Sequence, residues 1–386
     1  MFLVIPIVTR IVGIDKFGTI MYANRFAQFM IAFVSYGTSQ TGVRDVAFNI
    51  KDNKKLSVVF YNTLLIRAII FILFIALMFA LHWFNTLYYP YLLLAIPIVL
   101  AEVFNPLCFF IGAEKLKLFN ICNLVFNAVA IVAILIFIKG PTNAGWVNFI
   151  LGMGNTLTYL GLLVYFGFSF KLSFQLPLKS ELSKIGKDNF YLTINNISIN
   201  LQQSIIIFAL PRWGYATLLG PYTLCDRVIG QCRNLLITIN NAIYPNTAHI
   251  YKQSIKFWNA YRQKTKYLLA GVFFAGSILI FILAGFIIQV LSPEPSPTAV
   301  LFLRIMAFVP AISALNVLNV LDQLLKNNTV YIFRIAVILF ITAILVAFIS
   351  LNIGNAFLIG SFTLIVETAA WLMYEYAIKK PSTHNA

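Results

Sequence analysis

Charged residues are scarce in this sequence of 386 residues. Only 10% of the residues are charged and 60% are hydrophobic, whereas a soluble domain carries roughly 25% charged residues to keep its surface wetted. A chain with so little charge cannot cover a water-facing surface. The composition therefore excludes a set of soluble domains and indicates an integral membrane protein.

Acidic residues are scarcer still. The 12 acidic residues stand against 28 lysines and arginines, which gives a formal net charge of +16. The basic residues are dispersed between apolar runs and do not form one polar face, so we exclude a nucleic-acid-binding protein. The four cysteines lie in apolar segments, where buried thiols are ordinary packing residues. Cys225 and Cys232 share one predicted helix and lie roughly 10 Å apart, too far for a disulfide.

Patterns typical of catalytic and cofactor sites are also missing. The sequence contains no Gly-x-x-x-x-Gly-Lys-Ser/Thr phosphate loop, and Gly152-Met153-Gly154 has Leu157 where a dinucleotide-binding loop needs its third glycine. The three histidines are scattered along the chain, so neither a metal site nor a nucleophile–base pair is indicated. We therefore expect no cofactor, no metal and no enzymatic activity.

Long apolar runs are abundant, and a membrane-spanning helix needs about 20 mostly apolar residues. A shorter apolar piece covers 2–14. The sequence predicts an all-α polytopic membrane protein with about twelve spans, the first one incomplete. Prolines at positions 97, 106, 211, 221, 245 and 310 predict kinks or helix ends. The predicted full-length spans are 17–37, 58–83, 87–111, 118–138, 145–168, 190–210, 217–245, 267–291, 299–321, 330–350 and 354–378.

Basic residues alternate between the connecting loops. One set of loops, including the long connections 169–189 and 246–266, is rich in lysine and arginine, whereas the opposite set holds little beyond Lys16, Lys139 and Arg212. Because cytoplasmic loops carry the excess of basic residues, we predict that the rich set and the carboxyl terminus are cytoplasmic. The chain is expected to comprise an N-terminal six-helix bundle at 1–170, a linker at 171–189, a C-terminal six-helix bundle at 190–380 and a tail at 381–386.

An internal repeat relates the two halves. Gly18 and Gly220 are 202 positions apart (220 − 18), as are Arg25 and Arg227 and also Arg10 and Arg212. Six spans per half is an even number, so both copies should have the same orientation, as in transporters with parallel repeats.

The repeat also bears on the first helix. The second half's first helix is predicted to begin near Phe190, so its counterpart would begin about a dozen residues before Met1 (190 − 202). The opening piece lacks the basic region and cleavage site of a signal peptide. We therefore expect the first helix to be incomplete in this chain.

Ionisable residues occur within the predicted spans, where each costs roughly 2.5–3.5 kcal/mol on insertion scales and usually faces a bundle interior or a wet cavity. Arg10 and Arg67 are expected to extend towards a nearby interface. Deeper in the spans lie Arg25, Glu102, Asp226, Arg227, Arg233, Arg304, Glu367 and Glu375. Polar side chains on the same or neighbouring helices are Tyr22, Gln28, Asn195, Gln202 and Asn240.

Two interpretations of these residues are open. Arginine–carboxylate pairs can hold helices together, as Asp226 and a neighbouring arginine would. However, arginines recur at repeat-equivalent positions, which favours a positively lined lumen between two bundles. Arginine matches phosphate oxygens in bidentate geometry, so the predicted cargo is anionic, a phosphate or pyrophosphate, while amides and hydroxyls suit a sugar chain.

Several short motifs resemble one known family. The segment 7–13 with Phe17-Gly18, followed by Tyr36-Gly37 and Arg44-Asp45, resembles the amino-terminal pattern of the O-antigen flippases of the Wzx type. These form part of the polysaccharide-transporter branch of the multidrug/oligosaccharidyl-lipid/polysaccharide (MOP) exporter superfamily. The segments 112–117, 241–245 and 314–317 are similar to three further motifs of that branch. The resemblance extends over nearly the whole chain.

The resemblance implies two six-helix bundles around a cationic cavity in the bacterial inner membrane. It also implies that an undecaprenyl-pyrophosphate-linked oligosaccharide moves from the cytoplasmic to the periplasmic leaflet by alternating access, with membrane lipid and other polysaccharide-assembly proteins as partners. The candidate lumen arginines are then Arg25, Arg227, Arg233 and Arg304, and the candidate polar contacts are Tyr22, Gln28, Asn195, Gln202 and Asn240. Either arginine pairing or proton coupling is the expected role of Glu102, Asp226, Glu367 and Glu375.

Other functions are alternatives. A multidrug extruder of the same superfamily binds cations, so it would have an acidic lumen. A peptidoglycan-precursor flippase commonly has additional helices. A membrane-embedded glycan polymerase typically carries a large external loop, whereas the external loops predicted here are short.

Overall fold

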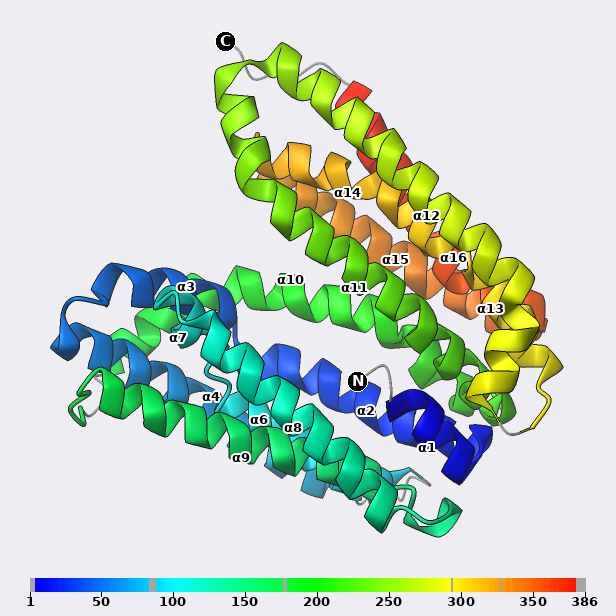
Figure 1. The fold of residues 1–386 in the computed structure, drawn as a ribbon, viewed down its shortest axis with the longest axis horizontal. Helices are drawn as coiled ribbons and strands as arrows, with labels where there is room; N and C mark the ends of the chain where they lie inside the picture. The colour runs from blue at the N-terminus through cyan, green and yellow to red at the C-terminus, as the bar shows by residue number, and fades with distance from the viewer. Residues whose placement is uncertain (1–3, 83–87, 176–178, 293, 327, 380–386) are drawn as a thin grey trace. The chain divides into compact units, whose positions relative to one another are not determined.

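A computed structural model describes residues 4–82, 88–175, 179–292, 294–326 and 328–379. These residues form α-helices and one short 3-10 helix, joined by turns and short connections (Figure 1). The chain divides into two compact units, with the boundary between Ser204 and Ile205. This boundary falls inside α10 (Lys179–Arg212), so one continuous helix leaves the first unit and enters the second.

The first unit contains the helices up to the first part of α10. They are α1 (Val4–Val12), α2 (Ile14–Ser35), α3 (Thr38–Asn49), α4 (Asn53–His82), α5 (Tyr89–Leu94), α6 (Ile96–Val103), α7 (Leu107–Gly112), α8 (Leu116–Phe137), η1 (Pro141–Asn143) and α9 (Trp146–Ser169).

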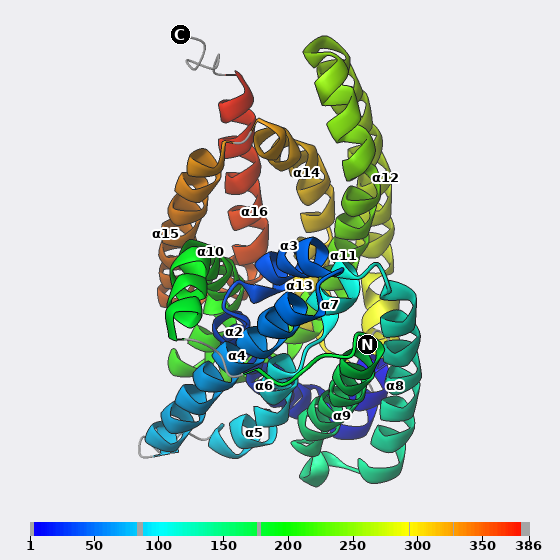
Figure 2. The same ribbon diagram turned by 90° about the vertical axis from the view of Figure 1, so that its left-hand side faces the viewer.

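The second unit contains the rest of α10 and six further helices. They are α11 (Ala216–Gln253), α12 (Ile255–Leu291), α13 (Pro297–Met306), α14 (Val309–Leu325), α15 (Thr329–Ile353) and α16 (Ala356–Lys379). Within this unit α14 packs against both α12 and α16, and Figure 2 shows α14 between them.

The predicted fold class is confirmed. Each predicted span lies on a helix or on a set of consecutive short helices, and the piece at 2–14 contains α1. The span predicted at 87–111 forms α5, α6 and α7, and the span at 299–321 forms α13 and α14. The four cysteines are free thiols, as expected.

Prolines explain where the interrupted spans break. Proline has no backbone N–H and clashes with the preceding turn, so it is tolerated in the first turn of a helix and ends a helix elsewhere. Pro97 and Pro310 lie in the first turns of α6 and α14, and Pro106 directly precedes α7. Pro221, by contrast, lies within the continuous helix α11.

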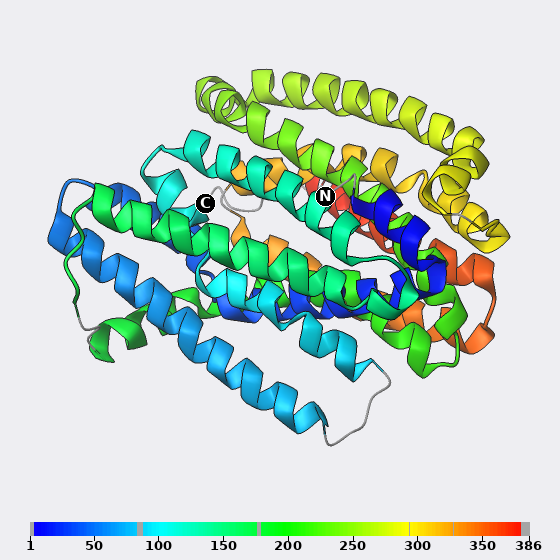
Figure 3. The same cartoon turned by 60° about the horizontal axis from the view of Figure 1, so that its bottom comes forward.

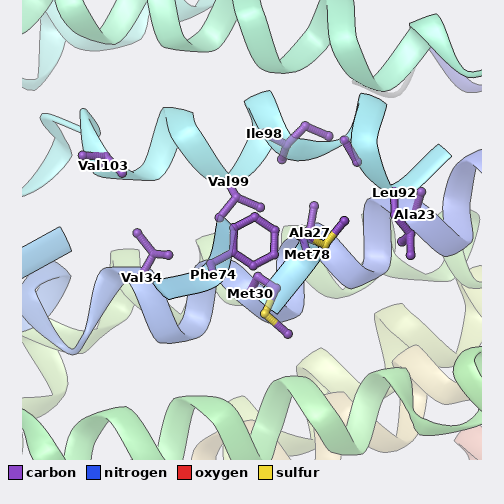
Figure 4. Close-up of a cluster of buried hydrophobic side chains, with 11 residues drawn as sticks. Ala23, Ala27, Met30, Val34, Phe74, Met78, Leu92, Ile98, Val99 and Val103 are labelled. Atoms are coloured by element: carbon purple, nitrogen blue, oxygen red, sulfur yellow. The ribbon is translucent and has the colours of Figure 1, made fainter. Parts of the chain in front are cut away.

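One buried apolar cluster of the first unit lies between α2, α4 and α6, and another joins α3, α4, α7, α8 and α9. Small and apolar residues recur on α2 at helical spacing, so they form one face that packs against the neighbouring helices. Figure 4 shows Ala27 and Met30 of α2 facing Phe74 of α4 and Val99 of α6. In the same unit α8 and α9 run side by side (Figure 3).

Hydropathy separates the helices into two classes. Among the described residues, eight helical stretches are long and apolar enough to cross a membrane. The helices α2, α10 and α11 are long enough but too polar to be among them. Such helices cannot face lipid on all sides, so their polar faces must contact protein or water. These three helices carry most of the predicted cargo contacts.

The internal repeat is visible in the helices. The first residues of α2 and α11 are 202 positions apart (216 − 14), and so are the first residues of α4 and α12 (255 − 53). Matched residues also share their degree of exposure. Gly18 and Gly220 are buried, Arg25 and Arg227 are half-buried, and Arg10 and Arg212 are exposed.

One expected connection is different in the structure. The segment 246–266 is almost entirely helical, because α11 ends at Gln253 and α12 begins at Ile255, with only Ser254 between them. The basic residues of this segment are therefore held on two long helices, and some of them are buried.

Candidate functional site

Tyr22, Arg25 and Gln28 lie three positions apart along α2 and are all half-buried. The Tyr22 ring stacks on Tyr88, with the ring centroids 4.7 Å apart. Asn24, which neighbours Arg25 in sequence, is buried, and its Nδ2 donates a hydrogen bond of 3.2 Å to Oδ1 of Asn148 on α9. The Asn24–Asn148 bond fixes how α2 is rotated about its own axis against α9. In this orientation the Arg25 side chain is partly accessible.

The matching helix of the second unit is α11. Asp226 and Arg227 are half-buried on it, as is Asn240 near its middle. The Tyr222 ring is buried, and its hydroxyl forms a hydrogen bond of 2.9 Å with the hydroxyl of Thr363 on α16. This bond anchors α11 one turn before Asp226. The side-chain oxygen of Asn240 is buried and accepts no hydrogen bond.

Arg233 and Glu367 form an ion pair within the second unit. Nη2 of Arg233 lies 3.1 Å from Oε2 of Glu367, and the two side chains are 22% and 23% exposed. Oγ of Ser313 on α14 donates to the other carboxylate oxygen of Glu367 at 2.5 Å. Nε of Arg233 is buried and donates no hydrogen bond. A guanidinium has five N–H donors, so this arginine keeps donors beyond its ion pair.

Glu375 lies two turns after Glu367 on the same helix. Its Oε2 accepts from Nζ of Lys266 on α12 and, at 3.0 Å, from Nδ2 of Asn319 on α14. The Lys266 residue is 6% exposed. The pair therefore ties three helices of the second unit together, with the lysine side chain 8% exposed and the carboxylate side chain 27% exposed.

A third charged cluster surrounds Asp322, which is fully buried. Its Oδ1 accepts from Nε1 of Trp258 at 2.7 Å. Its Oδ2 lies 3.1 Å from Nη1 of Arg262 and 2.7 Å from Nζ of Lys326. A buried carboxylate is stable only when it is paired and hydrogen-bonded, and Asp322 meets both conditions.

In the first unit, Arg67 is 1% exposed, so the expectation that it extends to the interface is wrong. Its Nη1 donates to the backbone oxygens of Glu102 at 3.2 Å and Asn105 at 2.8 Å, and its Nε donates to Oγ1 of Thr38 at 2.8 Å. Because Pro106 has no N–H, the Glu102 carbonyl lacks its helical partner four residues on and accepts instead from the backbone N–H of Asn105 at 3.2 Å. Arg67 supplies a second donor to this carbonyl and so stabilises the break between α6 and α7.

Glu102 is buried beside the same break. Its carboxylate accepts from Nδ2 of Asn105 at 2.9 Å. In the described residues the backbone of Glu102, rather than its carboxylate, receives the hydrogen bond from Arg67. Glu102 is therefore part of the first unit's packed interior.

The remaining predicted residues are more dispersed. Asn195 and Gln202 are half-buried on the part of α10 that belongs to the first unit. Arg304 is exposed in the last turn of α13, with its guanidinium carbon 5.6 Å from the centroid of the Phe281 ring. Arg233 is joined directly to one of the candidate carboxylates, Glu367.

Sequence reasoning missed the groups that complete the second unit's network. Arg262 and Lys266 were placed in a connection because they fall in a basic stretch, and Asp322 lies one residue past the predicted span 299–321. The sequence spacing of Arg262 and Lys266 could have indicated that they share one helix face. Trp258, Arg262 and Lys266 recur every four residues on one helix face, and acidic residues are rare enough in this chain for Asp322 to stand out.

The candidate residues on α2, α10 and α11 are half-buried and polar. Among the described residues, no group of three His, Cys, Asp or Glu side chains is placed to hold a metal ion. Arg25 and Arg227 occupy equivalent positions on the matched helices α2 and α11. This chemistry suits reversible binding of an anion that carries hydroxyl groups.

Comparisons with known proteins agree with this description. Residues 1–251 match the family described as "Polysaccharide biosynthesis protein". A protein of Escherichia coli (strain K12) described as "Putative O-antigen transporter" is 20% identical over 332 residues, which cover 84% of this chain and 79% of that protein. The inward-facing structure of a multidrug resistance MATE family transporter of the MOP superfamily aligns with a TM-score of 0.71 at 13% identity, covering 99% of each chain.

Proposed function

Because this chain belongs to the polysaccharide biosynthesis protein family, whose match covers residues 1–251, we propose that it transports a polysaccharide precursor across the membrane. The cargo in this proposal is an undecaprenyl-pyrophosphate-linked oligosaccharide, such as an O-antigen repeat unit. The protein moves it from the cytoplasmic to the periplasmic leaflet of the bacterial inner membrane by alternating access. The fold shared with a MATE family transporter supports transport over glycan chemistry.

The observation that carries the proposal is the matched placement of Arg25 and Arg227. Both are half-buried, both lie on helices too polar to face lipid on all sides, and they are 202 positions apart in matched helices. An arginine held in this way can bind a pyrophosphate with paired hydrogen bonds. Tyr22 and Gln28 beside Arg25, and Asn240 on α11, offer hydrogen bonds to sugar hydroxyls.

The carboxylates have a separate role in this proposal. Glu367 binds Arg233 and Ser313, and Glu375 binds Lys266 and Asn319. Proton binding to either carboxylate would weaken its hold on the basic partner and change the packing of α16 against α12 or α11. The second unit thus contains groups able to link a proton to a change of conformation. The carboxyl terminus is cytoplasmic in this proposal, because the most basic connections lie on its side.

The test measures surface polysaccharide in cells whose own copy of the gene is replaced by variants. Arg25→Ala and Arg227→Ala are each expected to abolish surface display while the amount of protein in the membrane is unchanged. Arg25→Lys should restore display only in part, because lysine keeps the charge but loses the bidentate geometry. Arg10→Ala and Arg212→Ala are the matched controls, since this second repeat-related pair is exposed.

Normal display from both Arg25→Ala and Arg227→Ala would refute anion binding by these residues. Equal loss of display in all four alanine variants would show that arginine removal acts through membrane insertion or topology. Either result would remove the main support for this proposal.

A further inference from the structure

A polar pocket lies in the first unit, apart from the arginines discussed above. It has a volume of about 280 Å³ and is lined by residues of α3, α4 and α10. The motif that begins at Tyr36-Gly37 and ends at Arg44-Asp45 supplies one wall. Residues at the start of α10 supply the opposite wall, and Figure 1 shows this part of α10 close to α3.

The motif determines how closely α10 approaches. Tyr36 and Gly37 both have positive φ angles of 43° and 68°, which end α2 and turn the chain into α3. A Cβ atom on Gly37 would lie 3.2 Å from Cβ of Asn189 and 3.3 Å from its backbone oxygen. The Tyr36 hydroxyl donates to the backbone oxygen of Gly186 at 3.2 Å. Glycine at position 37 therefore allows α10 to pack closely here, which brings Asn189 to the pocket.

Two buried amide oxygens in the pocket wall lack a donor. Asn62 is 3% exposed and Asn189 is 1% exposed, and neither side-chain oxygen accepts a hydrogen bond. The orientation of the Asn62 amide is fixed, because its Nδ2 donates to Oε2 of Glu181 at 2.8 Å and a carboxylate can only accept. An unsatisfied buried acceptor costs about 1–3 kcal/mol, so both oxygens favour a ligand that offers positive charge or O–H groups.

The charge of the lining selects between these ligands. Asp45, Glu181 and Asp188 line the pocket, and Arg44 is the basic residue among its described lining residues. Three of the chain's 12 acidic residues thus face one small space. The lining carries a formal charge of −2 (three carboxylates and one guanidinium), and the guanidinium is already paired with Asp45 at 3.0 Å. A neutral sugar would leave this charge unbalanced, whereas a divalent cation would balance it.

The size of the pocket indicates that such a cation keeps its water. A water molecule occupies about 30 Å³ in the liquid, so the volume of 280 Å³ is far larger than a bare ion and sufficient for an ion with its first hydration shell. The three carboxylates are not gathered as they would be around one dehydrated ion. Mg²⁺ dehydrates reluctantly and is usually held by one or two carboxylates with several waters retained.

We propose that this pocket binds a hydrated divalent cation, with Mg²⁺ as the reference ion. Waters of its shell donate to the side-chain oxygens of Asn62 and Asn189, and Glu181 and Asp188 balance its charge. The ion joins α3 and α4 to the first part of α10, the helix that continues into the second unit. It thereby stabilises the position from which α10 leaves the first unit. The proposal is independent of the identity of the transported cargo.

The experiment measures Mn²⁺ binding to the full chain by electron paramagnetic resonance, with Mg²⁺ as the competitor. The protein is held in phosphatidylcholine nanodiscs after removal of metal with a chelator, and empty nanodiscs give the background. One saturable site that Mg²⁺ displaces is expected. Asp188→Asn and Glu181→Gln should each weaken Mn²⁺ binding about tenfold, because each removes one negative charge near the ion.

Two further variants separate binding from folding. Asn189→Asp adds a charge where an unpaired oxygen lies and should tighten Mn²⁺ binding about tenfold. Asp15→Asn removes an exposed acid outside the pocket and should leave binding unchanged. The proposal is overturned by the absence of saturable Mn²⁺ binding to the native chain, or by equal affinities in the native chain, Asp188→Asn and Asn189→Asp. Displacement of Mn²⁺ only by a polyamine, and not by Mg²⁺, would also overturn it.

Discussion

The two units bury basic side chains in different ways, although their helices repeat at one offset. In the first unit, Arg67 donates to backbone carbonyls and to the Thr38 hydroxyl. In the second unit, Arg233 and Lys266 each pair with a carboxylate on α16. A carbonyl oxygen cannot change its charge, whereas a carboxylate can gain a proton. The first unit's buried arginine thus stabilises a fixed helix break, whereas the second unit's pairs contain the carboxylates to which the proposed function assigns proton coupling.

Removing one arginine from each unit gives the largest expected effect. Arg67→Met removes the donor to the Asn105 carbonyl, one of the two donors to the Glu102 carbonyl and the partner of the Thr38 hydroxyl, and should lower the free energy of unfolding by about 3–5 kcal/mol. Arg233→Met should cost about 1–2 kcal/mol, because its ion pair is partly exposed and Ser313 still donates to Glu367. Denaturant unfolding of the purified chain in detergent measures both. Equal losses would show that the two environments do not differ in this way.

Two glycines, one in each unit, allow the close packing of helices in the two units to be compared. A Cβ atom on Gly152 of α9 would lie 2.4 Å from the backbone nitrogen of Ile98 and 2.6 Å from the backbone carbon of Pro97. A Cβ atom on Gly360 of α16 would meet the Phe302 and Ile305 side chains, at 2.7 Å and 3.2 Å. Backbone cannot move aside as a side chain can. Gly152→Ala should therefore cost about 3 kcal/mol and Gly360→Ala about 1 kcal/mol.

Thermal unfolding of the two glycine variants, compared with the native chain in the same detergent, gives this ranking. A Gly360→Ala variant that melts at a lower temperature than Gly152→Ala would contradict it.

The smallest expected effect on stability comes from substituting two helix caps at repeat-matched positions. For one of the two caps this effect depends on pH. Asp52 and Ser254 are 202 positions apart (254 − 52) and cap α4 and α12. The pKa of Asp52 is lowered below its ordinary value of 3.8, mainly because its carboxylate accepts a hydrogen bond from the backbone N–H of Lys55. The backbone N–H of Lys54 acts in the same direction. Oγ of Ser254 accepts from the backbone N–H of Phe257 at 3.5 Å. One cap is therefore charged and the other is neutral.

A carboxyl with a lowered folded pKa stabilises the fold above its unfolded pKa, and this contribution is lost as the pH falls through the folded value. Asp52→Asn should lower the melting temperature slightly at neutral pH, and this difference should fade below about pH 3.8. Ser254→Ala should cost at most about 1 kcal/mol, independently of pH. Melting curves at neutral and acidic pH test both, and a pH-independent effect of Asp52→Asn would be the contrary result.

Much of the fold follows from periodic features of the sequence. Runs of apolar residues predict the positions of the spans, and the offset of Gly18 from Gly220 predicts the repeat seen in the starts of α2 and α11. Pro97, Pro106 and Pro310 mark the interrupted spans. The short helix α3 was not expected, because its polar sequence resembles a basic loop.

The candidate site could be predicted only in part. Residue type and helical spacing place Tyr22, Arg25 and Gln28 together on α2. They do not reveal that Arg67 turns inward, because this depends on the backbone oxygens of Glu102 and Asn105 at a helix break elsewhere in the chain. They also do not reveal that Lys266 and Glu375 meet, since these residues are separated by 109 positions. Contacts of this kind depend on tertiary packing, which leaves no periodic pattern in the chain.

The central claim, that Arg25 and Arg227 serve the transfer of a lipid-linked glycan, is tested most directly by the leaflet distribution of the precursor. Cells lacking this chain are complemented with the native form or with the Arg25→Ala/Arg227→Ala double variant at matched membrane levels. Lipid-linked repeat units are then measured on each leaflet. The native chain should restore repeat units to the periplasmic leaflet, and the double variant should leave them on the cytoplasmic leaflet. Restoration by the double variant to the native level would contradict the claim.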